Sequence, residues 1–196
     1  MSSNQEAVRT RDPDRRDRIL RAAADLLADR GFHGVSMAEI GGAAGIVGSG
    51  VYRHFDSKSA VLVALLDEVM DRLLATASTA AGSGRDEGSV LADLVRGQVL
   101  FAVDDRPLLQ LYQREVHNLP EADRRRLRRL QRHYVEEWVH LLLELRPDLA
   151  DGTARAKVHA AIGAVQSVAT YDSGLPRDEV VELLTDAAYA CLGLPA

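Results

Sequence analysis

Apolar side chains recur at intervals of three and four residues along most of the chain, which predicts α-helices rather than strands. The first such run covers residues 14–30, and Gly31 is placed to end it. A longer run covers residues 57–80, and a Gly- and Ser-rich loop follows it. Five further helices are predicted at residues 89–104, 107–117, 121–145, 153–170 and 178–192. The pattern therefore predicts an all-α protein.

Residues 36–55 predict two short helices joined by a tight turn. Ser36 is a good N-cap, because its hydroxyl can accept a hydrogen bond from a first-turn amide. Gly45 can supply the positive φ with which the chain leaves the first helix. Apolar residues then recur at helical spacing, at Ile46, Val51 and Phe55. The opposite face is polar and fits a DNA major groove about 12 Å wide. A generic pair of packed helices is the alternative.

Several spaced features between residues 15 and 66 resemble the N-terminal domain of TetR-family transcriptional regulators. They are Arg15-Arg16-Asp17-Arg18-Ile19-Leu20, Ala22-Ala23, Gly31-Phe32, Gly45-Ile46, Val51-Tyr52-Arg53-His54-Phe55, Ser57-Lys58 and Leu65-Leu66. The resemblance implies an all-helical homodimer with a three-helix DNA-binding domain at residues 13–73 (motif 36–55). It also implies a larger helical effector-binding and dimerisation domain at residues 74–196. The implied function is a sequence-specific repressor that a ligand releases from a palindromic operator, with activation as the alternative within the same fold.

By the same resemblance, eight residues are expected to contact double-stranded DNA: Ser36, Met37, Ser49, Gly50, Tyr52, Arg53, His54 and Lys58. Ser36 and Met37 lie at a helix N-terminus, which suits a phosphate, and Lys58 opens the next helix. Arg53 could read a guanine or hold a phosphate. Tyr52 could contact DNA or pack between helices.

The second helix of the motif, from Val47 to Phe55, is called the recognition segment here. It departs from the family pattern at its start. Val47 and Gly48 stand where the family usually has a capping Ser or Thr followed by a Lys or Arg. Gly48 and Gly50 each lower helix propensity by about 1 kcal/mol. We therefore expect an irregular or frayed recognition helix, and the operator sequence cannot be carried over from relatives.

Charge and composition restrict the partners. The chain has 196 residues, 46% of them hydrophobic, and a net charge of −5, which argues against a wholly cationic DNA binder. Residues 1–60 carry nine Arg or Lys against eight Asp or Glu, and the remainder carries fifteen against twenty-one. DNA contact must therefore come from a local patch and depend on salt. The lone Cys191 allows no internal disulfide, and neither a signal peptide nor a long apolar run is present. A cytoplasmic protein without membrane contact is expected.

The last two predicted helices suggest a homodimer. Residues 153–170 alternate small side chains with Val and Ile, and residues 178–192 are apolar over more than one core-facing stripe. In a two-fold dimer, both helices would meet their copies as a four-helix bundle, as in the TetR family. Burial within one monomer is the alternative.

An effector site is expected within residues 85–170, where polar and aromatic residues interrupt the apolar helices between Phe101 and Trp138 and Gln166 lies on a later helix. The candidates are Tyr112, Glu115, His117, Tyr134, Trp138 and Gln166. A mostly apolar cavity with a few polar anchors would suit a small apolar or aromatic molecule, although any one of these residues could instead be structural. The Arg-rich segment 124–132 could bind an anionic headgroup, such as that of a nucleotide-bearing acyl ligand, or could simply face water.

Other classes of function find less support. His133, Glu137 and His140 share one helical face, but an ion pair explains them more simply than a metal site does. The chain carries no GxSxG, HExxH, P-loop or dinucleotide motif, so an enzyme is the runner-up, and no cofactor is expected. A structural adaptor without DNA binding comes third.

Overall fold

The computed structural model describes residues 13–195 apart from residues 47, 82 and 83. All regular structure in this part of the chain is helical, which confirms the predicted fold class. The α-helices are α1 (Pro13–Arg30), α2 (Met37–Ala43), α3 (Lys58–Ala81), α4 (Glu87–Asp104), α5 (Arg106–Glu115), α6 (Glu121–Leu145), α7 (Asp151–Gln166) and α8 (Arg177–Leu192). Short 3₁₀ helices are η1 (Gly48–Arg53), η2 (Val116–Asn118) and η3 (Ser167–Ala169).

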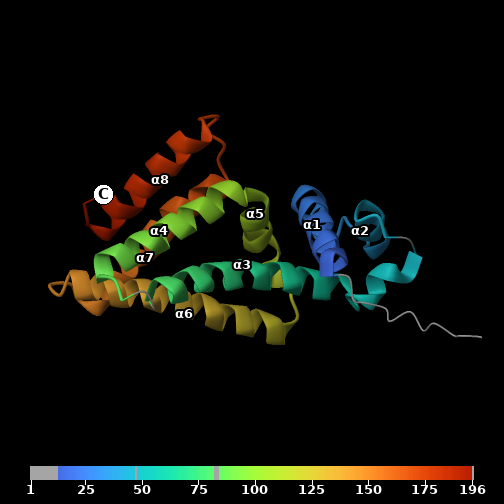
Figure 1. The fold of residues 1–196 in the computed structure, drawn as a ribbon, viewed down its shortest axis with the longest axis horizontal. Helices are drawn as coiled ribbons and strands as arrows, with labels where there is room; N and C mark the ends of the chain where they lie inside the picture. Colours follow the sequence, from blue (N-terminus) through green and yellow to red (C-terminus); the bar gives the residue numbers. More distant parts are fainter. Residues whose placement is uncertain (1–12, 47, 82–83, 196) are drawn as a thin grey trace, which may run out of the picture.

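The long helix α3 connects two groups of helices. Figure 1 shows α1 and α2 at one end of the molecule and α4, α6, α7 and α8 at the other, with α3 running between the two groups. Helix α3 packs on α1 at its start and on α4 and α6 further along, while α5 packs against α1. The predicted domain boundary at residues 73 and 74 falls inside this continuous helix.

The core follows from the predicted apolar periodicity. Ile19, Ala23 and Leu27 form one fully buried stripe along α1. On α3, buried apolar residues continue from Val61 to Ala77, so the same helix contributes to the core of both groups. A large aromatic side chain, Trp138, lies at the centre of the larger group with no exposed surface. None of the helices in the described ranges is long and apolar enough to cross a membrane.

Helix ends agree closely with the sequence signals. Gly31 ends α1 with a φ of 73°, and Gly45 follows α2 with a φ of 69°, both in the left-handed region that glycine favours. The recognition segment is a 3₁₀ helix rather than an α-helix, which agrees with the irregularity expected from its glycines.

Candidate DNA-reading surface and effector cavity

The N-terminus of α2 is held by a capping box. The Ser36 hydroxyl accepts a hydrogen bond from the Glu39 amide at 3.2 Å, and the Glu39 carboxylate accepts one from the Ser36 amide at 2.8 Å. Arg30 at the end of α1 also donates to this carboxylate, at 2.6 Å. Hydrogen bonds from the Ser36 hydroxyl and from Arg30 lower the pKa of Glu39 to about 2. Helix α2 is thereby fixed to the end of α1.

The turn between α2 and η1 is closely packed. A Cβ atom on Gly41 would lie 2.7 Å from Cγ2 of Val51, so only glycine allows this approach. Val51 and Phe55 are buried, as the periodicity predicted, and the Arg16 guanidinium lies 5.3 Å from the centroid of the Phe55 ring. The recognition segment therefore has a fixed position although it is not an α-helix.

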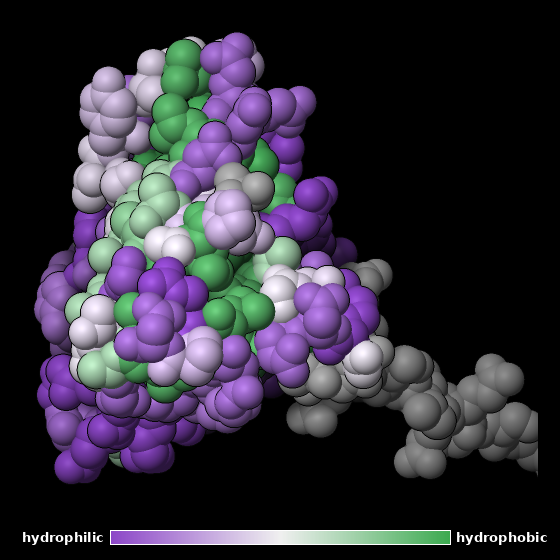
Figure 2. Space-filling view, turned by 90° about the vertical axis from the view of Figure 1, so that its left-hand side faces the viewer, coloured by the Kyte–Doolittle hydropathy of each residue, from purple (hydrophilic) through white to green (hydrophobic). Residues whose placement is uncertain are grey.

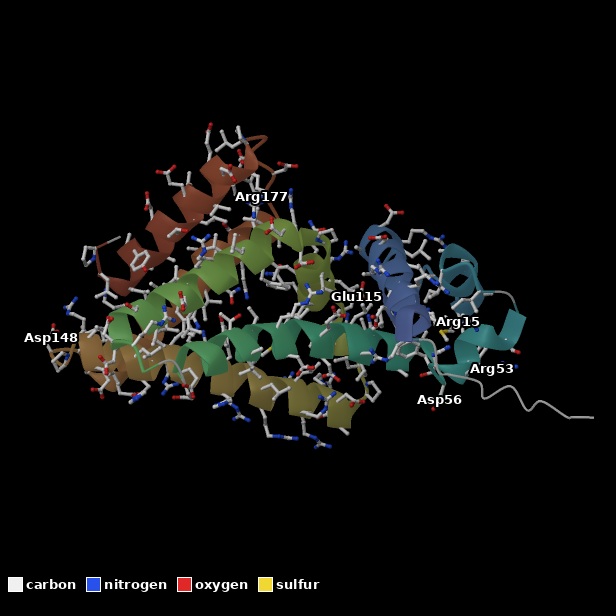
Figure 3. All side chains as sticks on the ribbon, in the orientation of Figure 1. Arg15, Arg53, Asp56, Glu115, Asp148 and Arg177 are labelled. Carbon is white, nitrogen blue, oxygen red and sulfur yellow. The ribbon has the colours of Figure 1, made fainter. Side chains whose placement is uncertain are left out.

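Three of the predicted DNA contacts lie on the open side of η1. Ser49, Tyr52 and Arg53 are exposed, and 54% of the Tyr52 surface is accessible, which sets aside the alternative of a packed tyrosine. Figure 3 shows Arg53 at the end of the molecule opposite Asp148. Polar and aromatic side chains at this end are therefore free to meet a large partner.

The other predicted contacts on this unit are less open. Met37 is buried, so only its backbone amide is available to a phosphate. Gly50 and His54 are half-buried. The Ser36 hydroxyl is occupied by the capping box and donates to Glu39 at 2.7 Å.

Lys58 is directed toward the protein. Its Nζ donates to the backbone oxygen of Val35 at 2.7 Å and lies 4.4 Å from the centroid of the Phe32 ring. Val35 immediately precedes the cap of α2, so Lys58 ties the start of α3 to the start of α2. An ammonium group has three donors, and two of them remain for a phosphate.

Glu115, expected in the effector site, lies at the junction between the two groups of helices. Its side chain is buried, and its carboxylate accepts hydrogen bonds from the Phe32 amide at 3.2 Å and from the Asn118 side chain at 2.6 Å. The Asn118 oxygen lies 3.2 Å from Nε2 of His33, and Arg114 donates to the backbone oxygen of Ala28. Figure 3 shows Glu115 between α5 and α1. We call these hydrogen bonds between residues 28–33 and residues 114–118 the α1–α5 junction.

A small, mostly apolar cavity lies among α3, α4, α5, α6 and α7. Its volume is about 30 Å³. Its lining consists of Val69, Met70, Leu73, Gln98, Phe101, Leu109, Tyr112, Gln131, Tyr134, Val135, Ile162 and Gln166. This space suffices for water but not for a typical organic ligand, whose site occupies roughly 300–1,000 Å³. An effector would have to widen it.

The cavity brings together three of the six residues predicted for the effector: Tyr112, Tyr134 and Gln166. Trp138 lies outside the lining and contacts it through Tyr134, edge to face, with ring centroids 6.0 Å apart. His117 is exposed in η2, and its backbone oxygen accepts a hydrogen bond from Arg124 at 3.4 Å. Neither His117 nor Glu115 lines the cavity.

Gln98 is a cavity residue that the sequence interpretation missed. Only 1% of its surface is exposed, and Oε1 of its amide accepts a hydrogen bond from the Tyr134 hydroxyl at 3.1 Å. Burial raises the pKa of Tyr134 well above its ordinary value, so this hydroxyl keeps its proton. The available signal was an amide at Gln98 in helical register with the apolar residues Leu91, Leu94 and Phe101.

The basic segment of α6 forms a surface hollow next to the cavity. Arg125, Arg128, Arg129 and Arg132 line this hollow together with Gln131, which also lines the cavity. Two neighbouring arginines are paired, Arg124 with Glu121 and Arg126 with Asp67. Further along α6, His133 lies 3.7 Å from Glu137, as the ion-pair interpretation predicted. The described residues contain no group of three His, Cys, Asp or Glu placed to hold a metal ion.

One face of α7, here called the uncharged face, is exposed and carries no Asp, Glu, Lys or Arg. Its residues are Thr153, Ala156, Ala160 and Gly163, with His159 beside them and Ser167 of η3 beyond them. Helix α8 packs beside α7 and exposes Leu183 to 56%. Figure 2 looks at the end of the molecule where α8 ends and shows apolar surface running between hydrophilic flanks.

An exposed polar recognition segment, fixed against a capped helix and joined by α3 to a helical body, defines a helix-turn-helix DNA-binding protein. The family profile described as bacterial regulatory proteins, tetR family, matches residues 19–65. A second profile, described as tetracyclin repressor-like, C-terminal domain, matches residues 85–188. The chain belongs to the tetR family of DNA-binding transcriptional regulators, which are not enzymes.

Individual relatives agree with this assignment. The HTH-type transcriptional repressor KstR2 of Rhodococcus jostii (strain RHA1) is 30% identical over 145 residues, which span 74% of this chain and 70% of that protein. A TetR-family regulator from Bordetella parapertussis 12822 has a similar fold, with a TM-score of 0.78 and 24% identity over 92% of this chain and 97% of the other. AibR in complex with isovaleryl coenzyme A and operator DNA superposes with a TM-score of 0.74 and 19% identity, covering 88% of this chain and 96% of the other.

Proposed function

We propose that this regulator is a repressor that binds a palindromic operator as a homodimer and leaves it when a small effector binds. The observation that carries the proposal is the exposure of Tyr52 and Arg53 on a segment that packing holds in place. Because packing already orders this segment, its side chains can contact base edges with little further loss of conformational entropy on binding DNA. KstR2 of Rhodococcus jostii is a repressor, which favours repression over activation.

We assign residues 13–73 to DNA binding and residues 74–196 to effector binding and dimerisation. Ser49, Tyr52 and Arg53 face the groove in this assignment, and the amides of Ser36 and Met37 meet a phosphate at the start of α2. Gly50, His54 and Lys58 border the same surface and complete the contact. The side chains of Ser49 and Arg53 make no hydrogen bond or ion pair with other described residues and can bind DNA without breaking one.

The uncharged face of α7 supports the proposed homodimer. Its Ala and Gly residues leave little side chain between the helix backbone and a partner, so a second helix can approach this face closely. Two copies of α7 and α8 would form a four-helix bundle across a two-fold axis. A two-fold dimer presents two recognition segments in opposite directions, and a palindromic operator matches that arrangement.

The effector that best fits is an amphipathic molecule with an apolar body and an anionic head. The apolar body would widen the cavity lined by Tyr112, Tyr134 and Gln166. Gln131 borders both the cavity and the arginine hollow, so an anionic head at the cavity mouth would lie over Arg128 and Arg132. AibR, which has a similar fold, was solved with isovaleryl coenzyme A, a molecule of this kind.

The effector can release the operator only if it binds more tightly to a conformation of the dimer in which the two recognition segments are wrongly spaced for the DNA. Helix α5 is suited to transmit the change, because Leu109 and Tyr112 line the cavity and Glu115 follows one turn later. Any displacement of α5 acts on the hydrogen bond from Glu115 to the Phe32 amide. The effector would thereby shift α1 and the recognition segment with it.

Selection of bound fragments from the source genome tests the proposal. In this experiment, purified protein is mixed with genomic DNA fragments at moderate salt, and the fragments that it retains are sequenced. We expect a shared inverted repeat whose half-sites lie about one helical turn apart. Retained fragments without a common sequence, or with a single unrepeated half-site, would refute the dimeric operator.

A further inference from the structure

Gln98 lines the proposed effector cavity and carries an unpartnered polar group. Its Oε1 accepts a hydrogen bond from the Tyr134 hydroxyl at 3.1 Å, while its Nε2 is buried without a hydrogen-bond partner. The residue belongs to the cavity lining and exposes only 1% of its surface. An amide nitrogen carries two donors, and leaving both unpaired in an apolar site is unfavourable.

The orientation of the amide follows from its neighbour. Burial raises the pKa of Tyr134, so its hydroxyl remains a donor across the physiological range and needs an acceptor. Within this cluster the acceptor is the Gln98 carbonyl oxygen, because the nearby Trp138 indole can only donate. Tyr134 thereby holds the Gln98 oxygen and leaves the NH₂ group for the cavity. Gln98 thus presents an unpaired donor to whatever enters.

We propose that Gln98 determines effector specificity by donating a hydrogen bond to a carbonyl oxygen on the part of the effector that enters the cavity. This inference rests on the proposed function, which places the effector there. A carbonyl oxygen accepts hydrogen bonds and can therefore pair with the unpaired amide nitrogen of Gln98. A pure hydrocarbon of the same shape leaves the amide unpaired and binds more weakly. The carbonyl belongs either to a ketone on the apolar body or to a thioester at its head.

Two matched pairs of probes test the assignment. The first pair is 1-tetralone and tetralin, and the second is S-butyl octanethioate and the corresponding butyl octyl thioether. Each pair differs only by a carbonyl oxygen in place of two hydrogens. Isothermal titration compares the four affinities for the full-length wild-type protein and for Gln98→Met, which keeps the length of the side chain but removes the donor.

In the wild-type protein we expect the carbonyl probe of at least one pair to bind about tenfold more tightly than its partner. In Gln98→Met the ratio falls to about one. Leu94→Met, a volume-conserving change at a buried position of the same helix outside the cavity lining, retains the wild-type ratio. The pair that shows the preference identifies the ketone or the thioester as the source of the carbonyl. Gln98→Leu provides a second donor-free variant if the methionine variant does not fold by circular dichroism.

The outcomes separate this inference from the proposed function. Equal binding of carbonyl and carbonyl-free probes by the wild-type protein keeps the cavity as an effector site but overturns the role of Gln98. A carbonyl preference that persists in Gln98→Met overturns it as well. Failure of all four probes to bind the wild-type protein overturns both the role of Gln98 and the placement of the effector.

Discussion

Arg53 and Lys58 are both cations near the recognition segment, but their surroundings differ. The Arg53 side chain is exposed and makes no hydrogen bond or ion pair with other described residues, whereas Nζ of Lys58 is bound to the Val35 backbone oxygen at 2.7 Å. A free guanidinium can adopt the bidentate geometry that guanine offers in the major groove. An ammonium held at the protein surface can add only a phosphate contact, which carries no sequence information.

We predict different losses for the two alanine variants. Arg53→Ala should lose about 1–3 kcal/mol of discrimination between the operator and variants with one changed base pair. Lys58→Ala should weaken binding to all sequences equally and reduce the salt slope by about one unit. Fluorescence anisotropy with a series of duplexes at several salt concentrations measures both quantities. An unchanged salt slope in Lys58→Ala would assign that lysine to packing on Phe32 alone, and a uniform loss in Arg53→Ala would make Arg53 a phosphate contact.

The capping carboxylate of α2 predicts a pH dependence. The pKa of Glu39 is lowered to about 2 in the folded protein from an unperturbed value near 4.5, so the unfolded chain binds the proton more readily. The stabilisation is complete above about pH 4.5 and is lost as the pH falls toward 2. Urea unfolding of the wild-type protein and Glu39→Gln should therefore give a stability difference that is constant above pH 5 and shrinks below it. A difference independent of pH would mean that the charge of Glu39 contributes nothing.

At the scale of elements, α5 connects the cavity to the DNA-binding helices. Leu109 and Tyr112 line the cavity, while Arg114 and Glu115 contact α1 and the residues that follow it. A helix of ten residues moves as one body, so a change at one side reaches the other. The α1–α5 junction includes a buried carboxylate, which makes its disruption costly.

We predict that Glu115→Ala lowers the free energy of unfolding by about 1–3 kcal/mol, because the Phe32 amide loses its acceptor in a buried position. His33→Ala, at an exposed position of the same junction, should change it by less than about 0.5 kcal/mol. Chemical denaturation followed by circular dichroism gives both values. Equally small changes in the free energy of unfolding for both variants would show that the α1–α5 junction contributes little to stability.

Most of the fold was predictable from local signals, but the site was only partly so. Capping at Ser36, the turns at Gly31 and Gly45 and the apolar stripes act over a few residues and can be read directly from the chain. The position of Glu115 depends on a hydrogen bond to Phe32, 83 residues away, which no local pattern encodes. Gln98 was missed for the same reason, because its partner Tyr134 lies 36 residues further along.

For the whole molecule, the proposed function depends on the exposed faces of α7 and α8. Leu183 is a large apolar side chain with 56% of its surface accessible, and it lies on α8, which packs against α7. Burial of such surface between two copies would provide the main driving force for association. The distance between the two recognition segments would then be set by this bundle.

We predict that Leu183→Glu converts the dimer to a monomer, because the symmetric interface would bring two carboxylates into an apolar environment. Sedimentation equilibrium at micromolar concentration measures the mass directly. Leu175→Glu, at an exposed position of the loop before α8, serves as a control and should remain dimeric. A wild-type protein that sediments as a monomer would refute the dimer itself.

The proposed function requires that this chain bind a specific DNA sequence as a dimer. Fluorescence anisotropy should compare the selected operator with a duplex of the same composition and shuffled sequence, both at physiological salt. We predict saturation at two protomers per operator and an affinity at least about a thousandfold higher than for the shuffled duplex. Equal affinity for the two duplexes, or a complex with one protomer, would contradict the account.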